Sequence, residues 1–342
     1  MTDEHLLAGL EQLMTSAGHG PLSLTVDREL TAGANRRTIR LIITPAGLDG
    51  GPYAAIAQLV ERDDAREGTT RSVLDEAAVV SAARANGVPA VEVLAAGRLP
   101  AATPPPIEVL VTREVAGETI PRRVLRSVGA VEDGGRKLTR SCGRALARLH
   151  AIDPAAVSLA QEPLPVFTVA RYLDHLTERL DDLPDPHPTF RFAINRLAHD
   201  LPSDPPKRSL IHGDFRNGNL IVDAADLAAA LDWELVHIGD PMEDLAWICL
   251  RTWRFGSDSR EVGGFGRLDD LRRAYADSGG RWRQDAFEWW TMARTAWWGI
   301  GLAAQAVAFV EGRSNSLVHA ASGRRVVELE YDLLGLLAAR VG

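Results

Sequence analysis

The sequence predicts an α+β fold, with a small lobe built on an antiparallel sheet followed by a larger, mainly helical lobe. Between residues 22 and 62, and again at 107–115, apolar and polar residues alternate in short runs, which is typical of strands. From residue 137 onward, apolar residues recur at three- and four-residue spacings, which indicates helices. A chain of 342 residues is long enough for two lobes that each bury a core.

The composition is that of an ordinary globular protein, with 46% hydrophobic and 25% charged residues. The net charge of −8 argues against non-specific binding to nucleic acid. The most apolar segment, residues 295–310, is shorter than the ~20 residues that span a membrane, so we expect a buried helix and no membrane partner. Cys142 and Cys249 offer no disulfide framework, and no apolar run follows Met1, so we expect a cytoplasmic protein.

Residues 209–234 contain the residue types that phosphoryl transfer needs. Asp214 and Asn219 are separated by four residues, the spacing by which a kinase catalytic loop places its base beside a magnesium-binding amide. Two apolar runs then flank a turn at residues 223–226, a hairpin pattern that would fold Asp232 back beside Asn219. We expect Asp214 to act as the base, and Asn219 and Asp232 to hold the Mg²⁺ that bridges the ATP phosphates. Taken singly, each of these residues would suit an ordinary turn.

Three motifs in this region resemble the aminoglycoside phosphotransferase/choline kinase family: His212-Gly-Asp-Phe-Arg-Asn-Gly-Asn219, Leu231-Asp-Trp-Glu234 and Gly239-Asp-Pro-Met-Glu-Asp-Leu-Ala246. The subgroup that they resemble most includes the kinase-like domains fused to some acyl-CoA dehydrogenases. The resemblance implies a two-lobed, protein-kinase-like fold, with an N-terminal lobe at residues 1–115 and a C-terminal lobe at residues 116–342. It also implies ATP and Mg²⁺ as cofactors and the hydroxyl group of a small molecule as the phosphoryl acceptor.

The first elements expected are a helix in the first 20 residues, ended by Pro21, and two strands at 24–30 and 38–44. The resemblance implies that the turn between these strands lies over the ATP phosphates. Gly33 is the only glycine of that turn. An ordinary hairpin turn is an equally good interpretation of the residues themselves.

A third strand at 54–62 and a helix at 71–86 follow. The resemblance implies that Arg62, at the end of the strand, binds phosphates, since arginine can contact two phosphate oxygens at once. A register shifted by one residue would instead place Glu61 in the site. Glu76 borders the apolar stripe of the helix, so we expect it to pair with Arg62 as a kinase lysine pairs with its glutamate. A solvated surface glutamate is the alternative.

Residues 107–115 should form a strand that leads into the hinge between the lobes. In the family that this chain resembles, the hinge backbone receives adenine, which assigns Thr112 and Val115 to nucleotide binding. The lobe boundary is therefore expected near residue 116.

The second lobe is predicted to be helical. We expect six helices, at 137–150, 169–183, 190–201, 268–277, 284–310 and 317–340. His150 ends the first of them and is better explained as a histidine packed against the core than as a functional group. Trp290, Trp297 and Trp298 approximate one face of a later helix, where core packing is the main interpretation and a pocket wall the alternative.

Asp240, Pro241 and Glu243 form a capping-box sequence that should begin another helix. Asp244 would brace the catalytic loop or contact substrate. Only seven residues separate Asp232 from Asp240, which leaves no room for the activation segment of a protein kinase. We therefore expect a small-molecule kinase, with a non-catalytic ATP-binding pseudokinase as the alternative from another class.

The acceptor is expected to be neutral or anionic. Arg216 lies inside the catalytic loop, and arginine matches carboxylate and phosphate groups. Arg216, Glu234 and Asp244 are assigned to substrate binding on their positions in the three motifs. An aminoglycoside, which is a polycation, is the alternative acceptor, and the sequence leaves the oligomeric state open.

Overall fold

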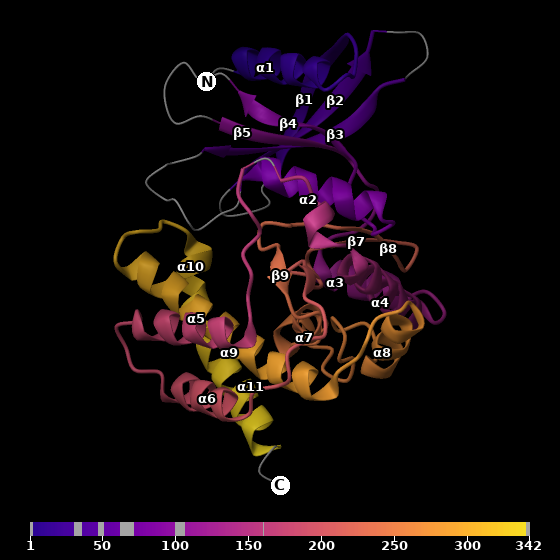
Figure 1. The fold of residues 1–342 in the computed structure, drawn as a ribbon. Helices are drawn as coiled ribbons and strands as arrows, with labels where there is room; N and C mark the ends of the chain where they lie inside the picture. The colour runs from indigo at the N-terminus through magenta and orange to yellow at the C-terminus, as the bar shows by residue number, and fades with distance from the viewer. Residues whose placement is uncertain are drawn as a thin grey trace. The chain divides into compact units, whose positions relative to one another are not determined.

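The computed structural model describes residues 3–30, 36–46, 51–61, 72–99, 107–159 and 161–339. The chain forms two compact units, and each combines several stretches of sequence, which Figure 1 colours along the chain. The first unit comprises Met1–Gly117, Asp153–Pro163 and Ala228–Val236; the second comprises Glu118–Ile152, Leu164–Leu227 and His237–Gly342. A single cut at residue 116 would place Asp232 in the second lobe, whereas its contacts place it in the first unit.

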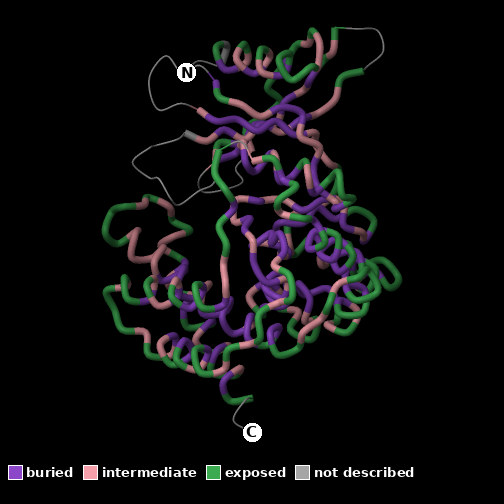
Figure 2. Tube along the Cα trace, viewed as in Figure 1, coloured by how far each residue is buried: buried purple, intermediate pink, exposed green. Residues whose placement is uncertain are grey.

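The first unit is built on a five-stranded antiparallel sheet in the order β1-β2-β3-β5-β4. The strands are β1 (Leu22–Leu30), β2 (Arg37–Pro45), β3 (Tyr53–Glu61), β4 (Val93–Leu99) and β5 (Ile107–Arg113). Because side chains alternate between the two faces of a strand, Val109 and Val111 pack on one face of β5 and Leu110 on the other. Helix α1 (Asp3–Ser16) packs on the face of the sheet that carries Val109 and Val111, and helix α2 (Val73–Ala85) packs on the face that carries Leu110. Both faces of the sheet are therefore covered, and the central strands are buried (Figure 2).

The sequence predicted β1, β2, β3 and β5 but not β4. The centre of β4 is Ala-Ala-Gly, which has little preference for strands, and its register against β5 is irregular between Val93 and Ala95. Pairing with β5 therefore makes this segment a strand, and no local signal shows that pairing.

The second unit is mainly helical and surrounds a long, largely buried helix, α9 (Gln284–Val310). The other helices are α3 (Pro121–Gly129), α4 (Gly134–Ala151), α5 (Val169–Asp181), α6 (Pro188–His199), α7 (Met242–Trp247), α8 (Leu268–Asp277), α10 (Leu317–Ser322) and α11 (Val326–Ala338). Two short strands, β6 (Ser209–Ile211) and β9 (His237–Gly239), pair antiparallel within this unit. None of the helices in the described ranges combines the length and apolarity needed to cross a membrane.

The predicted helix at 317–340 is wrong as a single element. It is divided into α10 and α11 by a 3₁₀ turn, Gly323–Arg325. A Cβ built on Gly323 would lie 2.9 Å from the Cβ of Ala306 on α9, so the chain approaches α9 too closely there for a larger residue. The helix is thus interrupted where the chain passes close to α9, and the sequence has no strong helix-stop signal at this point.

Candidate active site

The predicted catalytic loop joins β6 to β7 (Leu220–Asp223). Gly213 and Gly218 adopt φ of 80° and 118°, which L-residues with a side chain rarely do. A Cβ on Gly218 would in addition lie 2.6 Å from Nη1 of Arg216. The two glycines therefore allow the tight course of the loop on either side of Asp214.

The carboxylate of Asp214 accepts hydrogen bonds from three side chains. Nε of Arg216 and Nε1 of Trp247 donate to Oδ1 at 2.9 and 2.7 Å, and Nδ2 of Asn219 donates to Oδ2 at 2.6 Å. The Asp214 side chain keeps 13% of its surface exposed. The structure thus brings Asp214 and Asn219 together, and it holds the carboxylate in one orientation.

Arg216 contacts the predicted base directly. Besides its bond to Asp214, its guanidinium lies over the ring of Trp253, 4.3 Å from the ring centroid. In this geometry Arg216 braces the loop. Its contact with an acceptor stays a prediction.

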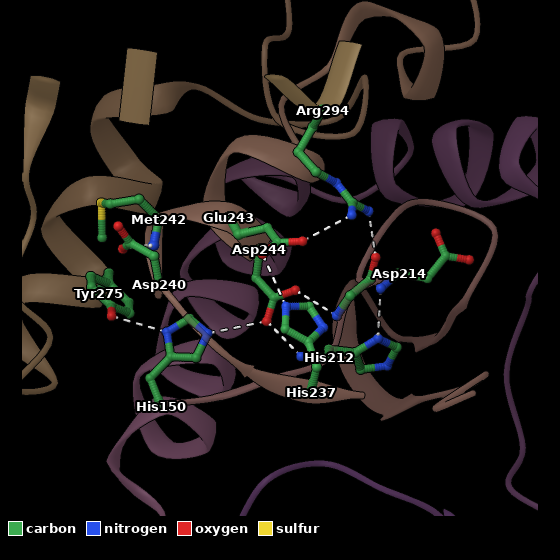
Figure 3. Close-up of polar contacts among 11 residues, drawn as sticks. His150, His212, Asp214, His237, Asp240, Met242, Glu243, Asp244, Tyr275 and Arg294 are labelled. Atoms are coloured by element: carbon green, nitrogen blue, oxygen red, sulfur yellow. Dashed lines mark hydrogen bonds and ion pairs between the residues drawn. The ribbon is translucent and has the colours of Figure 1, made fainter. Parts of the chain in front are cut away.

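Asp244 is completely buried, and its polar contacts are drawn in Figure 3. Its carboxylate accepts the backbone N–H groups of His212 and Gly213 at 2.8 and 2.9 Å, and it lies 3.1 Å from Nε2 of His150. Burial would raise the pKa of Asp244, but the hydrogen bond and charge of His150, together with His212, outweigh it and hold that pKa below its usual value. The assignment of Asp244 to substrate is therefore wrong: both oxygens brace the loop, away from solvent.

His150 does more than pack against the core. Its Nδ1 lies 3.0 Å from the hydroxyl oxygen of Tyr275 on α8, and its Nε2 faces Asp244. Burial raises the pKa of the Tyr275 hydroxyl, which therefore stays protonated. His150 thus connects α4 and α8 to the carboxylate under the loop (Figure 3).

The predicted capping box is half right. Oδ1 of Asp240 accepts the N–H of Met242 at 3.0 Å, as a cap should. Glu243 does not return to the cap; its oxygens bind Nε2 of His237 at 3.0 Å and Nη1 of Arg294 at 2.9 Å. Glu243 is fully buried, and an unpaired carboxylate is costly in the interior. It therefore pairs with His237 and Arg294 instead of binding the N-terminus of α7.

Arg294 is a site residue that the sequence did not indicate. It is 3% exposed, donates from Nη2 to the carbonyl oxygen of Gly213 at 2.6 Å, and lies between the rings of Trp247 and Trp297. It therefore connects α9 to the loop (Figure 3). The available signal was a single arginine in the most apolar helix of the chain.

The hairpin after Asn219 folds as predicted. β7 pairs with β8 (Asp226–Ala230) through a turn whose central residues, Ala224 and Ala225, have φ of 46° and 59°. Asn219 belongs to the second unit and Asp232 to the first, so their joint binding of a metal stays a prediction. No group of three or more His, Cys, Asp or Glu side chains in the described residues gathers as a metal site would.

Asp232 adopts φ of 65°, an uncommon conformation for a residue other than glycine. Non-glycine residues held in this region cost about 1–3 kcal/mol and concentrate at functional sites. The backbone at Asp232 is therefore consistent with a functional role in the first unit.

Glu76, on α2, is buried and forms an ion pair with Arg36, whose Nη1 lies 2.8 Å from Oε2. Burial raises the pKa of Glu76, and the charge of Arg36 opposes that shift. The inward orientation expected of Glu76 is thus observed, but its partner here is Arg36 and not the predicted Arg62. Arg62 and Gly33 lie outside the described residues.

Thr112 is buried in β5, where it pairs with Ile56 of β3, and Val115 is half-buried just after the strand. Their assignment to adenine binding stays a prediction. Glu234, assigned to substrate, instead lies 3.2 Å from Nη2 of Arg36, and its contact with an acceptor is likewise a prediction.

The model of the phosphotransferase enzyme family matches residues 28–281, which is most of the chain. The chain belongs to this family. Among curated proteins, the chain is 34% identical over 115 residues to acyl-CoA dehydrogenase family member 10 of Mus musculus. That match covers 31% of this chain and only 10% of the mouse protein.

Solved structures share the fold of this chain. One described as a candidate aminoglycoside phosphotransferase from Ralstonia eutropha superposes with a TM-score of 0.71 at 20% identity, covering 97% of this chain and 98% of that one. An amicoumacin kinase in complex with AMP-PNP, Ca²⁺ and Ami gives a TM-score of 0.59 at 14% identity, covering 90% and 88% of the two chains. The predicted α+β, kinase-like fold is confirmed.

Proposed function

We propose that this protein is an ATP-dependent small-molecule kinase that transfers the γ-phosphoryl group to a hydroxyl group, with Asp214 as the base. The observation that carries the proposal is the Asp214 carboxylate, fixed by Arg216, Trp247 and Asn219 before any substrate arrives. Preorganised groups of this kind lower a barrier because they need no rearrangement during the reaction.

The residues present fit a nucleotide and Mg²⁺. Nδ2 of Asn219 is used by Asp214, which leaves the amide oxygen of Asn219 outside that bond, and Asp232 offers a carboxylate on strained backbone. Both are hard oxygen ligands of the kind that Mg²⁺ prefers together with substrate phosphates. When bound, Mg²⁺-ATP supplies the phosphoryl group and the metal neutralises the charge that develops on it.

Asp214 would receive the acceptor hydroxyl on Oδ2. That oxygen accepts one side-chain hydrogen bond, from Asn219, whereas Oδ1 accepts two. The hydroxyl would donate to Oδ2, direct its own oxygen towards the phosphoryl group, and give up its proton there. Since the protein has little covalent chemistry to perform in phosphoryl transfer, this orientation is the main contribution of Asp214.

The acceptor is proposed to be neutral or anionic. A pocket for a polycation needs free carboxylates, but the three between residues 240 and 244 are engaged: Asp240 caps α7, Glu243 binds Arg294, and Asp244 holds the loop. Arg216, which keeps 22% of its side chain exposed, is the charged group beside the base. A hydroxyacyl thioester fits this charge, and the likeness to an acyl-CoA dehydrogenase family member favours it.

A coupled ADP-release screen tests this function. Hydroxyacyl-CoA compounds, neutral alcohols, choline-type amines and aminoglycosides would be compared with the parent protein and with Asp214→Asn. Turnover of a neutral or anionic alcohol that Asp214→Asn abolishes supports the proposal. Binding of Mg²⁺-ATP without turnover of any class, unchanged in Asp214→Asn, would support the pseudokinase interpretation instead.

A further inference from the structure

Arg36 is a buried arginine at the entrance to β2, in the first unit. Its side chain is 8% exposed and lies against two carboxylates. Nη1 is 2.8 Å from Oε2 of Glu76, and Nη2 is 3.2 Å from Oε2 of Glu234. Nη1 is also 3.5 Å from Oε1 of Gln58 on β3.

The described strand β3 carries no cation of its own. Its sequence is YAAIAQLVE, and its buried residues Ala55, Ala57 and Leu59 pack in the core shared with α1. Arg37 of β2 is opposite Leu59, so Arg36 lies one residue further along, beside the end of β3. In protein kinases a lysine on the third strand pairs with a glutamate of the neighbouring helix. Here, among the described residues, the helix glutamate Glu76 pairs with Arg36, which directly precedes β2.

The two partners of Arg36 differ in exposure. The Glu76 side chain is 3% exposed, whereas that of Glu234 is 29% exposed. A buried ion pair contributes little stability by itself, because removing both charges from water costs about as much as their attraction returns. Because Glu76 is the buried partner, we expect it to keep its ion pair with Arg36 when a ligand binds. Because Glu234 is partly exposed, an anion from solution can take its place beside the guanidinium.

Three carboxylates among the described residues act on Arg36. Burial acts to lower the pKa of Arg36, but Glu76, Glu234 and Asp232 all act to raise it, and they prevail. A divalent cation that compensates carboxylates of this group would favour the approach of a phosphate to the guanidinium.

We propose that Arg36 is the residue that binds the nucleotide phosphates, held by Glu76 and exchanging Glu234 for phosphate oxygens. This inference rests on the proposed ATP-dependent function. It assigns to Arg36 the phosphate binding that the family resemblance implied for Arg62. Glu76 and Glu234 engage one N–H on each Nη nitrogen, which leaves Nε and the second N–H of Nη2 for a phosphate.

Isothermal calorimetry on the full chain tests the assignment, with Mg²⁺-ATP and adenosine as probes. Arg36→Ala should weaken Mg²⁺-ATP about 10–100-fold, the range expected for lost charge-assisted hydrogen bonds. Adenosine, which has no phosphate, should bind both proteins equally. Arg37→Ala is the matched control: Arg37 is the next residue, 44% exposed, and pairs with Glu29 on the sheet surface.

Two further variants keep the test decisive. Arg36→Gln combined with Glu76→Gln leaves no unpaired buried charge, so it should fold and still lose Mg²⁺-ATP affinity. Glu234→Gln should bind ATP without Mg²⁺ several-fold more tightly than the parent, because it removes the competitor of the phosphates.

The outcomes separate this inference from the proposed function. A parent protein that does not bind Mg²⁺-ATP at all would overturn both. A parent that binds it, with affinity lost in Arg62→Ala and retained in Arg36→Ala, would leave the kinase function intact and overturn the assignment to Arg36.

Discussion

At the scale of single residues, the candidate site depends on hydrogen bonds that orient Asp214. Trp247 donates from a ring that is itself buried and packed against Trp253, Trp297 and Trp298. Asn219 donates from a position five residues further along the loop. Each donor has a different structural support, so each can be removed without removing the others.

Removing the charge of Asp214 should stop turnover while leaving the nucleotide bound. Asp214→Asn keeps the shape of the side chain but cannot accept the hydroxyl proton, so kcat should fall about 10²–10⁴-fold, as is usual for a lost general base. The affinity for Mg²⁺-ATP, measured by calorimetry, should change little. Near-normal turnover in Asp214→Ala would show that another group is the base.

Trp247→Phe should separate orientation from packing. The substitution keeps a ring in the aromatic cluster but removes the N–H that lies 2.7 Å from Asp214, so kcat should fall roughly 10-fold. Trp298→Phe is the matched control, because Trp298 belongs to the same aromatic cluster and its Nε1 has no hydrogen-bond partner among the described residues. Equal kcat in the two variants would contradict the role given to Trp247.

Asp214 and Asn219 were predictable because their relation is local, set by four intervening residues and two glycines. Arg36 and Arg294 were not, since each meets its carboxylate partner only after the fold brings together distant segments of the chain. The pairing of Glu76 shows the same limit. Its inward orientation followed from helical periodicity, but the identity of its partner depended on the sheet register.

At the scale of elements, α4, α7 and the catalytic loop are connected through Asp244. Its carboxylate serves two backbone N–H groups and His150, all of them buried or nearly so. Removing one member of such a set leaves the others without a partner in a place that water does not reach.

Asp244→Ala should cost about 3–5 kcal/mol in the free energy of unfolding, as breaking a buried charge pair does. The pKa of Asp244 is lowered in the folded state, so its stabilisation is present above the unfolded pKa of ~3.9 and is lost as the pH falls through the folded value. The difference in Tm between parent and variant should therefore be large at pH 7 and shrink below about pH 4. A difference that grew towards acid would contradict this sign.

The glycines of the last helices should respond oppositely to substitution. Gly323→Ala should destabilise by about 1–3 kcal/mol, because its Cβ would lie 2.9 Å from Ala306. Gly335→Ala should instead stabilise by about 0.5–1 kcal/mol, since that glycine lies in the exposed interior of α11 with nothing within 4 Å. Urea unfolding of both variants measures the two signs.

Most elements were predictable because their patterns are internal to them. The helices from α4 to α9 follow apolar periodicity, and the β7–β8 hairpin follows its turn. Among the elements that were missed or wrong, β4 and the division between α10 and α11 depend on neighbours: a strand partner in one case and the surface of α9 in the other.

At the scale of the whole molecule, the first unit is discontinuous in sequence. The segment 153–163 is held there by Asp75, whose carboxylate accepts the N–H groups of Gln161 and Glu162 at 2.9 and 3.2 Å. The segment 228–236 is held by the bond from Ala230 N–H to the carbonyl oxygen of Pro89. Family motifs gave the fold class, but contacts of this kind have no signature in the sequence.

This discontinuity has a consequence during synthesis. A ribosome releases residues 1–117 long before residues 228–236 exist, so the first unit must wait for a late segment before all its contacts are available. The buried acids Asp75 and Glu76 of α2 would meanwhile lie at the surface of an unfinished unit, where water can solvate them. A nascent chain stalled after residue 117 should therefore be cut readily by protease within α2, whereas one stalled with residue 236 outside the tunnel should resist.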